Sequence, residues 1–151
     1  MKLEALVGSG KRIGLLTVPF LIIGVILNAL IPSFFNVGGP SFALEVISIS
    51  VLIPGVTIWI WSVVLILTKV PKKELIVEGP YSLVKHPLYT GVALLVLPWA
   101  GFLLNTWLGA ALGIVVYIGS RVFSPEEEET LSKTFGAGWD EYCNRVRIHW
   151  L

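Results

Sequence analysis

Two short polar segments carry the side chains of this chain that are best suited to chemistry. The first, residues 78–91, contains the basic pair Lys85 and His86. The second follows Arg121 and contains four consecutive glutamates, Glu126–Glu129. Basic groups and carboxylates that face each other can bind a ligand with charges of both signs. We therefore ask which elements position these two segments.

In the first segment, Pro87 is placed to begin a helix. Proline is favoured at the first helical position, because the N–H group that it lacks would have no partner there. His86 then precedes the helix, where the helix dipole favours an anion. Tyr89 lies on the first turn, and Gly91 leaves space for a ligand to approach the backbone. These residues and Lys85 are candidate binding residues; the alternative is that they only anchor the chain at the membrane surface.

In the second segment, Ser124 and Pro125 predict a new helix. Serine is a favoured N-cap and proline a favoured first residue. Glu127, three residues after Ser124, completes a capping box. Acidic residues also suit a helix N-terminus electrostatically. Helix capping therefore accounts for most of the acidic run.

Glu128 is the exception within that run. It lies three residues before Leu131 and seven before Phe135, which places it on the apolar face of the predicted helix. A carboxylate on such a face is costly unless it is paired. Arg121, His86 or a cationic ligand can supply the partner, so Glu128 is the strongest candidate for a functional carboxylate.

The composition places both segments in a membrane protein. Of 151 residues, 55% are hydrophobic and 14% are charged, and the mean hydropathy is +0.82. A soluble domain of this size cannot cover its surface with so few charges, and disorder requires the opposite composition. The single cysteine, Cys143, excludes a disulfide framework and a cysteine zinc cluster, and we predict no metal site. A net charge of +1 gives no global reason to bind nucleic acid.

Long uncharged stretches predict an all-α integral membrane protein with a helical C-terminal segment at the cytoplasmic surface. About four transmembrane helices are expected, at roughly residues 13–31, 46–68, 88–104 and 107–120. The last two share one uncharged stretch that is too long for a single helix, and Asn105-Thr106 is the expected turn between them. Gly109 and Gly113 form a GxxxG pair that allows these two helices to approach closely.

The basic residues predict the orientation. All 11 Lys and Arg residues lie before Ile13, between Lys69 and Lys85, or after Ser120. Positive charge is enriched on the cytoplasmic side of membrane proteins. We therefore expect both termini and the loop at 69–86 to be cytoplasmic, which agrees with an even number of spans.

Together, the two polar segments resemble the isoprenylcysteine carboxyl methyltransferase family and its relatives, the phospholipid N-methyltransferases. The family pattern Arg-His-Pro-x-Tyr-x-Gly corresponds to Lys85-His86-Pro87-Leu88-Tyr89-Thr90-Gly91. A helical hairpin follows, and then the pattern Glu-Glu-x-x-Leu-x-x-x-Phe-Gly-x-x-Tyr-x-x-Tyr. It corresponds to Glu127, Glu128, Leu131, Phe135, Gly136, Trp139 and Tyr142. The resemblance covers about residues 79–146 of a single domain, residues 1–151.

The resemblance implies a membrane methyltransferase that uses S-adenosylmethionine and a lipophilic acceptor from the bilayer. It implies cofactor-binding roles for Lys85, His86, Tyr89, Gly91, Glu127 and Glu128, and catalytic roles for Arg121 and Glu128. Lys85 replaces the family's arginine, Trp139 replaces a tyrosine, and Arg121 lies about two residues farther from the acidic pair than the family's arginine does. The acceptor (an isoprenylcysteine carboxylate, a phospholipid amine or a thiol) and the oligomeric state stay open, and membrane lipids are the other expected partners.

Two other classes of function are compatible with parts of the sequence. Steroid 5α-reductases share a similar His-Pro helix start but use NADPH, and the Glu127-Glu128 segment favours methyl transfer over that reaction. A non-catalytic membrane scaffold or a small transporter is the second alternative. Transport favours ionisable groups within the spans, and the expected spans contain none.

Overall fold

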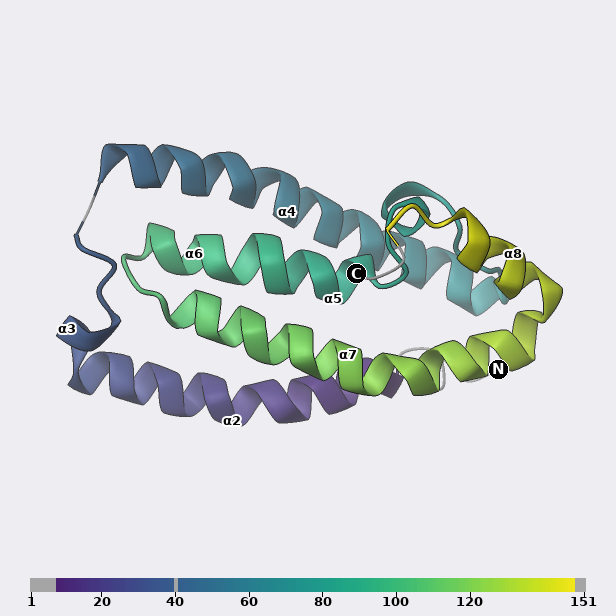
Figure 1. Cartoon of the computed structure of the whole chain (residues 1–151), viewed down its shortest axis with the longest axis horizontal. Helices are drawn as coiled ribbons and strands as arrows, with labels where there is room; N and C mark the ends of the chain where they lie inside the picture. The colour runs from purple at the N-terminus through teal and green to yellow at the C-terminus, as the bar shows by residue number, and fades with distance from the viewer. Residues whose placement is uncertain (1–7, 40, 149–151) are drawn as a thin grey trace.

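A computed structural model describes residues 8–39 and 41–148, which form helices and no strand within those ranges. Four long helical segments run side by side along the molecule (Figure 1). They are α2 (Gly8–Leu30), α4 (Phe42–Lys69), the composite helix Pro87–Leu103, and α7 (Leu108–Phe135). The shorter elements are α3 (Pro32–Phe35), the 3-10 turns η1 (Val70–Lys72) and η2 (Gly79–Ser82), and α8 (Ala137–Arg145). The expected all-α membrane class is confirmed.

Among the described residues, three helices are long and apolar enough to cross a membrane, at Ser9–Leu30, Phe42–Lys72 and Leu108–Phe135. The fourth expected span, Pro87–Leu103, is a shorter apolar helix. The first three expected ranges lie close to helices of the structure. The fourth expected range, 107–120, is shorter than the helix in the structure, because α7 continues for another 15 residues to Phe135.

The helix start predicted at Ser124 is wrong, and so is the capping box with Glu127. Trp107 precedes the first turn of α7, and Pro125 lies inside the helix. An interior proline costs about 3 kcal/mol, because it removes a backbone hydrogen bond and crowds the preceding turn. Packing against α2 continues along this part of α7, where Phe123 packs against the buried core that contains Ile13. Burial of this helix face outweighs the local preference for a helix start.

The third span is a helix with a widened turn. It consists of α5 (Pro87–Gly91), the π-helical turn η3 (Val92–Val96) and α6 (Leu97–Leu103). Pro98, just after the widened turn, lacks the N–H group that would bond four residues back. Such an interruption favours a local change in the hydrogen-bond pattern of a helix.

The expected close approach of the third and fourth spans is confirmed. A Cβ atom added at Gly109 would lie 2.0 Å from the carbonyl oxygen of Leu97, and one at Gly113 would lie 2.3 Å from that of Ala93. A Cβ atom added at Gly101 of α6 would lie 2.8 Å from the Cα atom of Gly109. Only glycine permits this contact between the two backbones.

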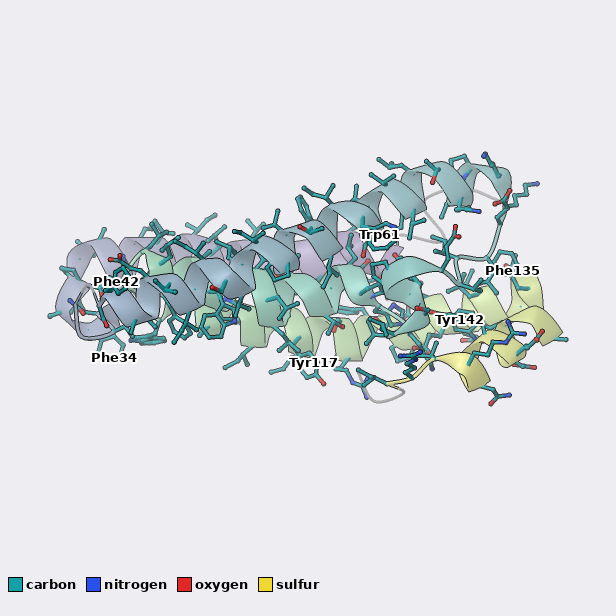
Figure 2. The ribbon with its side chains drawn as sticks, turned by 90° about the horizontal axis from the view of Figure 1, so that it is seen from above. Phe34, Phe42, Trp61, Tyr117, Phe135 and Tyr142 are labelled. Carbon is teal, nitrogen blue, oxygen red and sulfur yellow. The ribbon has the colours of Figure 1, made fainter. Side chains whose placement is uncertain are left out.

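The turn expected at Asn105-Thr106 is also confirmed, since Asn105 has a φ of 55° between α6 and α7. Next to it, the Trp107 indole donates a hydrogen bond of 2.8 Å to the carbonyl of Phe34. The Trp107 ring stacks on Phe35 with centroids 4.8 Å apart. These contacts join α3 to the α6–α7 turn. Figure 2 shows that Phe34 lies at one end of the molecule and that Phe135 and Tyr142 lie toward the other end.

The charged groups gather at one end of the bundle. There α2 begins, α4 ends, α5 begins and α7 meets α8 (Figure 1). Among the described residues, Glu45 in the first turn of α4 is the one charged side chain at the other end. The two chain ends, for which a cytoplasmic position is expected, lie outside the described residues. The fold thus brings both polar segments of the sequence to the same end.

Candidate active site

Three polar side chains from the two polar segments meet in one cluster. The Lys85 ammonium donates a hydrogen bond of 2.9 Å to Oε2 of Glu128, and Nε2 of His86 lies 3.0 Å from Oε1. The side chains of Lys85, His86 and Glu128 are 20%, 12% and 30% exposed. Glu128 therefore pairs with His86, as the sequence suggested, and with Lys85 in addition. We call these residues the Lys85–His86–Glu128 cluster.

Helix starts and packing hold the two sides of the cluster. His86 precedes α5 and Pro87 is its first residue, as predicted. The first turn of α5 is fixed because Tyr89 and Ala93 pack against Val116 of α7 in a buried core. Glu128 follows on the same continuous helix α7. The cluster thus depends on the contact between the third and fourth spans.

The helix α8 lies beside the cluster, since Trp139 and Tyr142 line one cavity with Lys85 and His86. The chain turns at Gly136, which has a φ of +51°, so α8 is a separate helix and not a continuation of α7. Trp139 and Tyr142 are buried there against Leu131 and Phe135. Both aromatic residues of α8 therefore pack against the apolar residues that follow the acidic segment.

Burial keeps the hydroxyl and thiol groups of this region protonated. It raises the pKa of the Tyr81 and Tyr142 phenols above the ordinary tyrosine value. The Tyr142 hydroxyl can then donate its 2.9 Å hydrogen bond to the carbonyl of Tyr81, which ties α8 to η2. Burial also raises the pKa of the Cys143 thiol, so Cys143 is not an activated nucleophile.

Glu127, the neighbour of Glu128, has a different environment. Its carboxylate accepts a hydrogen bond from the hydroxyl of Ser9 in the first turn of α2. The same Ser9 oxygen lies 3.0 Å from the hydroxyl of Tyr89. Two predicted site residues, Glu127 and Tyr89, are thus brought together by a third residue that the sequence did not indicate.

Two cavities adjoin the Lys85–His86–Glu128 cluster. The polar cavity, of about 320 Å³, lies between the start of α5 and α7 and is also lined by Arg121 and Ser124. The aromatic cavity is smaller, about 60 Å³, and is lined by Tyr81, Leu131, Phe135, Trp139 and Tyr142, among others. The cluster therefore separates a polar space from an aromatic one.

A third hollow, the apolar groove, lies between α4 and the third span. Its volume is about 590 Å³ and its lining is almost entirely apolar, with Trp61, Leu94 and Ile148 among the contributors. Thr90 borders both this groove and the polar cavity. The groove thus places an apolar surface next to the charged site.

Residues 40–133 of the chain, more than half of its length, match the model of the isoprenylcysteine carboxyl methyltransferase (ICMT) family. The chain belongs to this family. No curated protein and no solved structure matches it significantly. Family membership makes the protein an integral-membrane methyltransferase. The relation to phospholipid N-methyltransferases stays a prediction, because the match is to the ICMT family.

The range matched by the ICMT family contains every site residue expected from the sequence. These residues are Lys85, His86, Tyr89, Gly91, Arg121, Glu127 and Glu128. It excludes α2 and α8, and therefore also Ser9, Trp139 and Tyr142. Elements outside the matched range thus contribute residues to the candidate site.

The expected residues do not all face the same space. Arg121 is exposed on α7 and lines the polar cavity with Glu128, and it forms no ion pair within residues 8–39 and 41–148. Gly91 lines the apolar groove, where an added Cβ would lie 3.6 Å from Ile58. Gly91 therefore faces α4 and the groove, away from Glu128, and its role in cofactor binding stays a prediction.

Sequence reasoning missed Ser9. Its partner Glu127 lies 118 positions away, and no sequence motif connects the start of the first span with the acidic run. Ser124 was interpreted as a helix cap, whereas its hydroxyl is buried at the wall of the polar cavity. Within the described ranges this hydroxyl has no hydrogen-bond partner.

Proposed function

We propose that this protein transfers a methyl group from S-adenosylmethionine to a lipophilic acceptor at the cytoplasmic face of the membrane. The observation that carries the proposal is the Lys85–His86–Glu128 cluster, with a polar cavity on one side and an aromatic cavity on the other. The cytoplasmic placement follows from the basic residues at this end of the bundle, because positive charge is retained on that side.

The residues around the cluster fit the cofactor. The polar cavity is within the usual range of small-molecule sites, about 300–1,000 Å³. Arg121 and Lys85 would bind the carboxylate of the methionine part, and Glu128 would balance positive charge. The buried hydroxyl of Ser124, which lacks a partner among the described residues, also calls for a polar ligand, since buried polar groups are usually hydrogen-bonded.

The aromatic cavity suits the remaining part of the cofactor. Trp139 and Tyr142 present ring surfaces that would cover a flat base or a cationic centre. When bound, S-adenosylmethionine supplies an electrophilic methyl group on a positively charged sulfur. The protein's own residues then have two tasks: Glu128 and Arg121 orient the reacting molecules, and α8 keeps water out of the site.

The apolar groove supports a lipophilic acceptor. The family resemblance implied an acceptor that enters from the bilayer. The groove lies between α4, the second span, and the third span, and α7 does not line it. An acceptor chain in the groove would reach Thr90, which also borders the polar cavity. The chemical class of the acceptor is not determined by this apolar surface.

The decisive experiment compares two cofactors on the purified protein in lipid nanodiscs. We expect S-adenosylmethionine to bind and NADPH not to bind. Labelled S-adenosylmethionine, supplied with a panel of isoprenylcysteines and amine-bearing phospholipids, should then transfer its label to one lipid class. Binding of NADPH without binding of S-adenosylmethionine would favour the reductase alternative, and binding of neither would favour a scaffold.

Arg121→Gln is expected to weaken S-adenosylmethionine binding about tenfold. The loss corresponds to one charge-assisted hydrogen bond, about 1.4 kcal/mol. Isothermal titration in nanodiscs measures the Kd. Arg145→Gln is the matched control, because Arg145 is also exposed but pairs with Glu141 on α8. Equal affinities of the two variants would remove Arg121 from the proposed site.

Leu94→Trp is expected to raise the KM for a lipophilic acceptor about tenfold and to leave the Kd for S-adenosylmethionine unchanged. Leu94 lines the apolar groove and is 42% exposed, so a larger ring would fill the space for an acceptor chain. A tenfold change corresponds to about 1.4 kcal/mol. The control is Leu104→Trp, at an exposed site at the end of α6. If both variants keep the wild-type KM, the groove is not the acceptor site.

A further inference from the structure

The first turn of α2 reaches the site from outside the range matched by the ICMT family. Ser9 is 5% exposed, and its hydroxyl contacts both Glu127 and Tyr89. A serine hydroxyl has one proton to donate and can accept two hydrogen bonds. Since that proton goes to the Glu127 carboxylate, the Tyr89 hydroxyl must donate to Ser9. The three groups thus form a directed chain from Tyr89 through Ser9 to Glu127.

This chain links the two sides of the Lys85–His86–Glu128 cluster. Glu127 is the neighbour of Glu128 on α7, and the Tyr89 ring lies nearly parallel to that of His86, with centroids 6.3 Å apart. We infer that Ser9 is a positioning residue of the methyl-transfer site, which holds Glu127 and Tyr89 so that Glu128 alone pairs with Lys85 and His86. The inference rests on the proposed function.

The reason is competition between two adjacent carboxylates. Glu127 and His86 line the same aromatic cavity. A buried carboxylate that loses a hydrogen bond is left with an uncompensated desolvation cost. Without the Ser9 hydroxyl, Glu127 would turn toward His86 and compete with Glu128. Ser9 prevents this by giving Glu127 a partner of its own.

Other contacts hold the start of α2 in place independently of Ser9. Ile13 is buried in the core formed with Tyr89 and Val116. Arg12 pairs with Glu126 at the surface, where both side chains are more than half exposed. Removing the Ser9 hydroxyl should therefore change the arrangement of Glu127 without detaching the helix.

The test measures the Kd for S-adenosylmethionine in nanodiscs, with the melting temperature as a check on folding. Ser9→Ala is expected to weaken binding about tenfold, the effect of one charge-assisted hydrogen bond. Arg12→Gln, in the same turn, is expected to keep the wild-type Kd, because an exposed ion pair contributes little. In a Glu127→Gln background, Ser9→Ala should add no further loss, because the two residues act as a unit.

Each result bears on one of the two proposals. A wild-type Kd in Ser9→Ala, or losses that add in the double variant, would overturn the role of Ser9 and leave the proposed function intact. Equal losses in Ser9→Ala and Arg12→Gln would assign the effect to helix docking and also overturn it. If the wild-type protein binds no S-adenosylmethionine, the proposed function fails and the role of Ser9 fails with it.

Discussion

Replacing Glu128 with glutamine is expected to weaken S-adenosylmethionine binding about 100-fold and to abolish methyl transfer. Glutamine keeps the shape of the side chain but removes the charge that Lys85 and His86 share. Hydrogen bonds to charged groups contribute about 1.5–3 kcal/mol each, and 100-fold corresponds to about 2.8 kcal/mol. The proposed balancing of the cofactor's positive charge is lost at the same time. Titration with S-adenosylmethionine measures the first effect, and label transfer measures the second.

The adjacent Glu129 provides the matched control. Its side chain is 66% exposed and pairs with Lys133 one turn later on α7. Surface pairs of this kind contribute about 0.3–0.5 kcal/mol, so Glu129→Gln should bind S-adenosylmethionine like the wild-type protein. If Glu128→Gln also binds with wild-type affinity, Glu128 has no part in cofactor binding, and the buried cluster is then a structural ion pair.

Gly109→Ala is expected to lower the melting temperature by about 6–12 °C. The added Cβ would lie 2.0 Å from the carbonyl oxygen of Leu97 and 2.8 Å from Cα of Gly101. Neither backbone group can rotate away, so α6 and α7 must separate. Overpacking of this kind costs about 1–3 kcal/mol, and the upper value corresponds to the stated shift for a chain of this size. Thermal unfolding in detergent measures the effect.

Gly14→Ala is the control for Gly109→Ala, since an added Cβ at Gly14 meets nothing within 4 Å. Alanine also favours a helix over glycine by about 0.5–1 kcal/mol, so the control should melt at or above the wild-type temperature. Equal melting of the two variants would contradict the close contact of α6 and α7. Because Glu128 lies on α7, we also expect Gly109→Ala to lose methyl transfer more than Gly14→Ala does.

Much of the membrane fold could be predicted because it follows from where charges are absent. The uncharged stretches located the first three spans within a few residues. The turn at Asn105 was predicted because the uncharged stretch is too long for one helix. The close approach of the last two spans was predicted from the small residues Gly109 and Gly113. The pairing of His86 with Glu128 could be predicted because a carboxylate on an apolar helix face needs a polar partner.

The errors arose where tertiary packing overrode a local signal. Ser124 and Pro125 have the residue types of a helix start, yet α7 continues through them, and the flanking residues Phe123 and Glu127 contact α2. Ser9 carries no signal of its own, because its partners come from two other helices.

The continuity of α7 has a mechanical consequence. At 1.5 Å per residue, its 28 residues form a rod of about 42 Å, longer than the roughly 30 Å hydrocarbon core of a bilayer. Glu128 lies in the second half of this rod, toward Phe135. A helix responds to a thinner bilayer by tilting, and a continuous helix passes that tilt along its whole length. A change in the tilt of α7 would therefore also move Glu128, whose Oε1 lies 3.0 Å from Nε2 of His86.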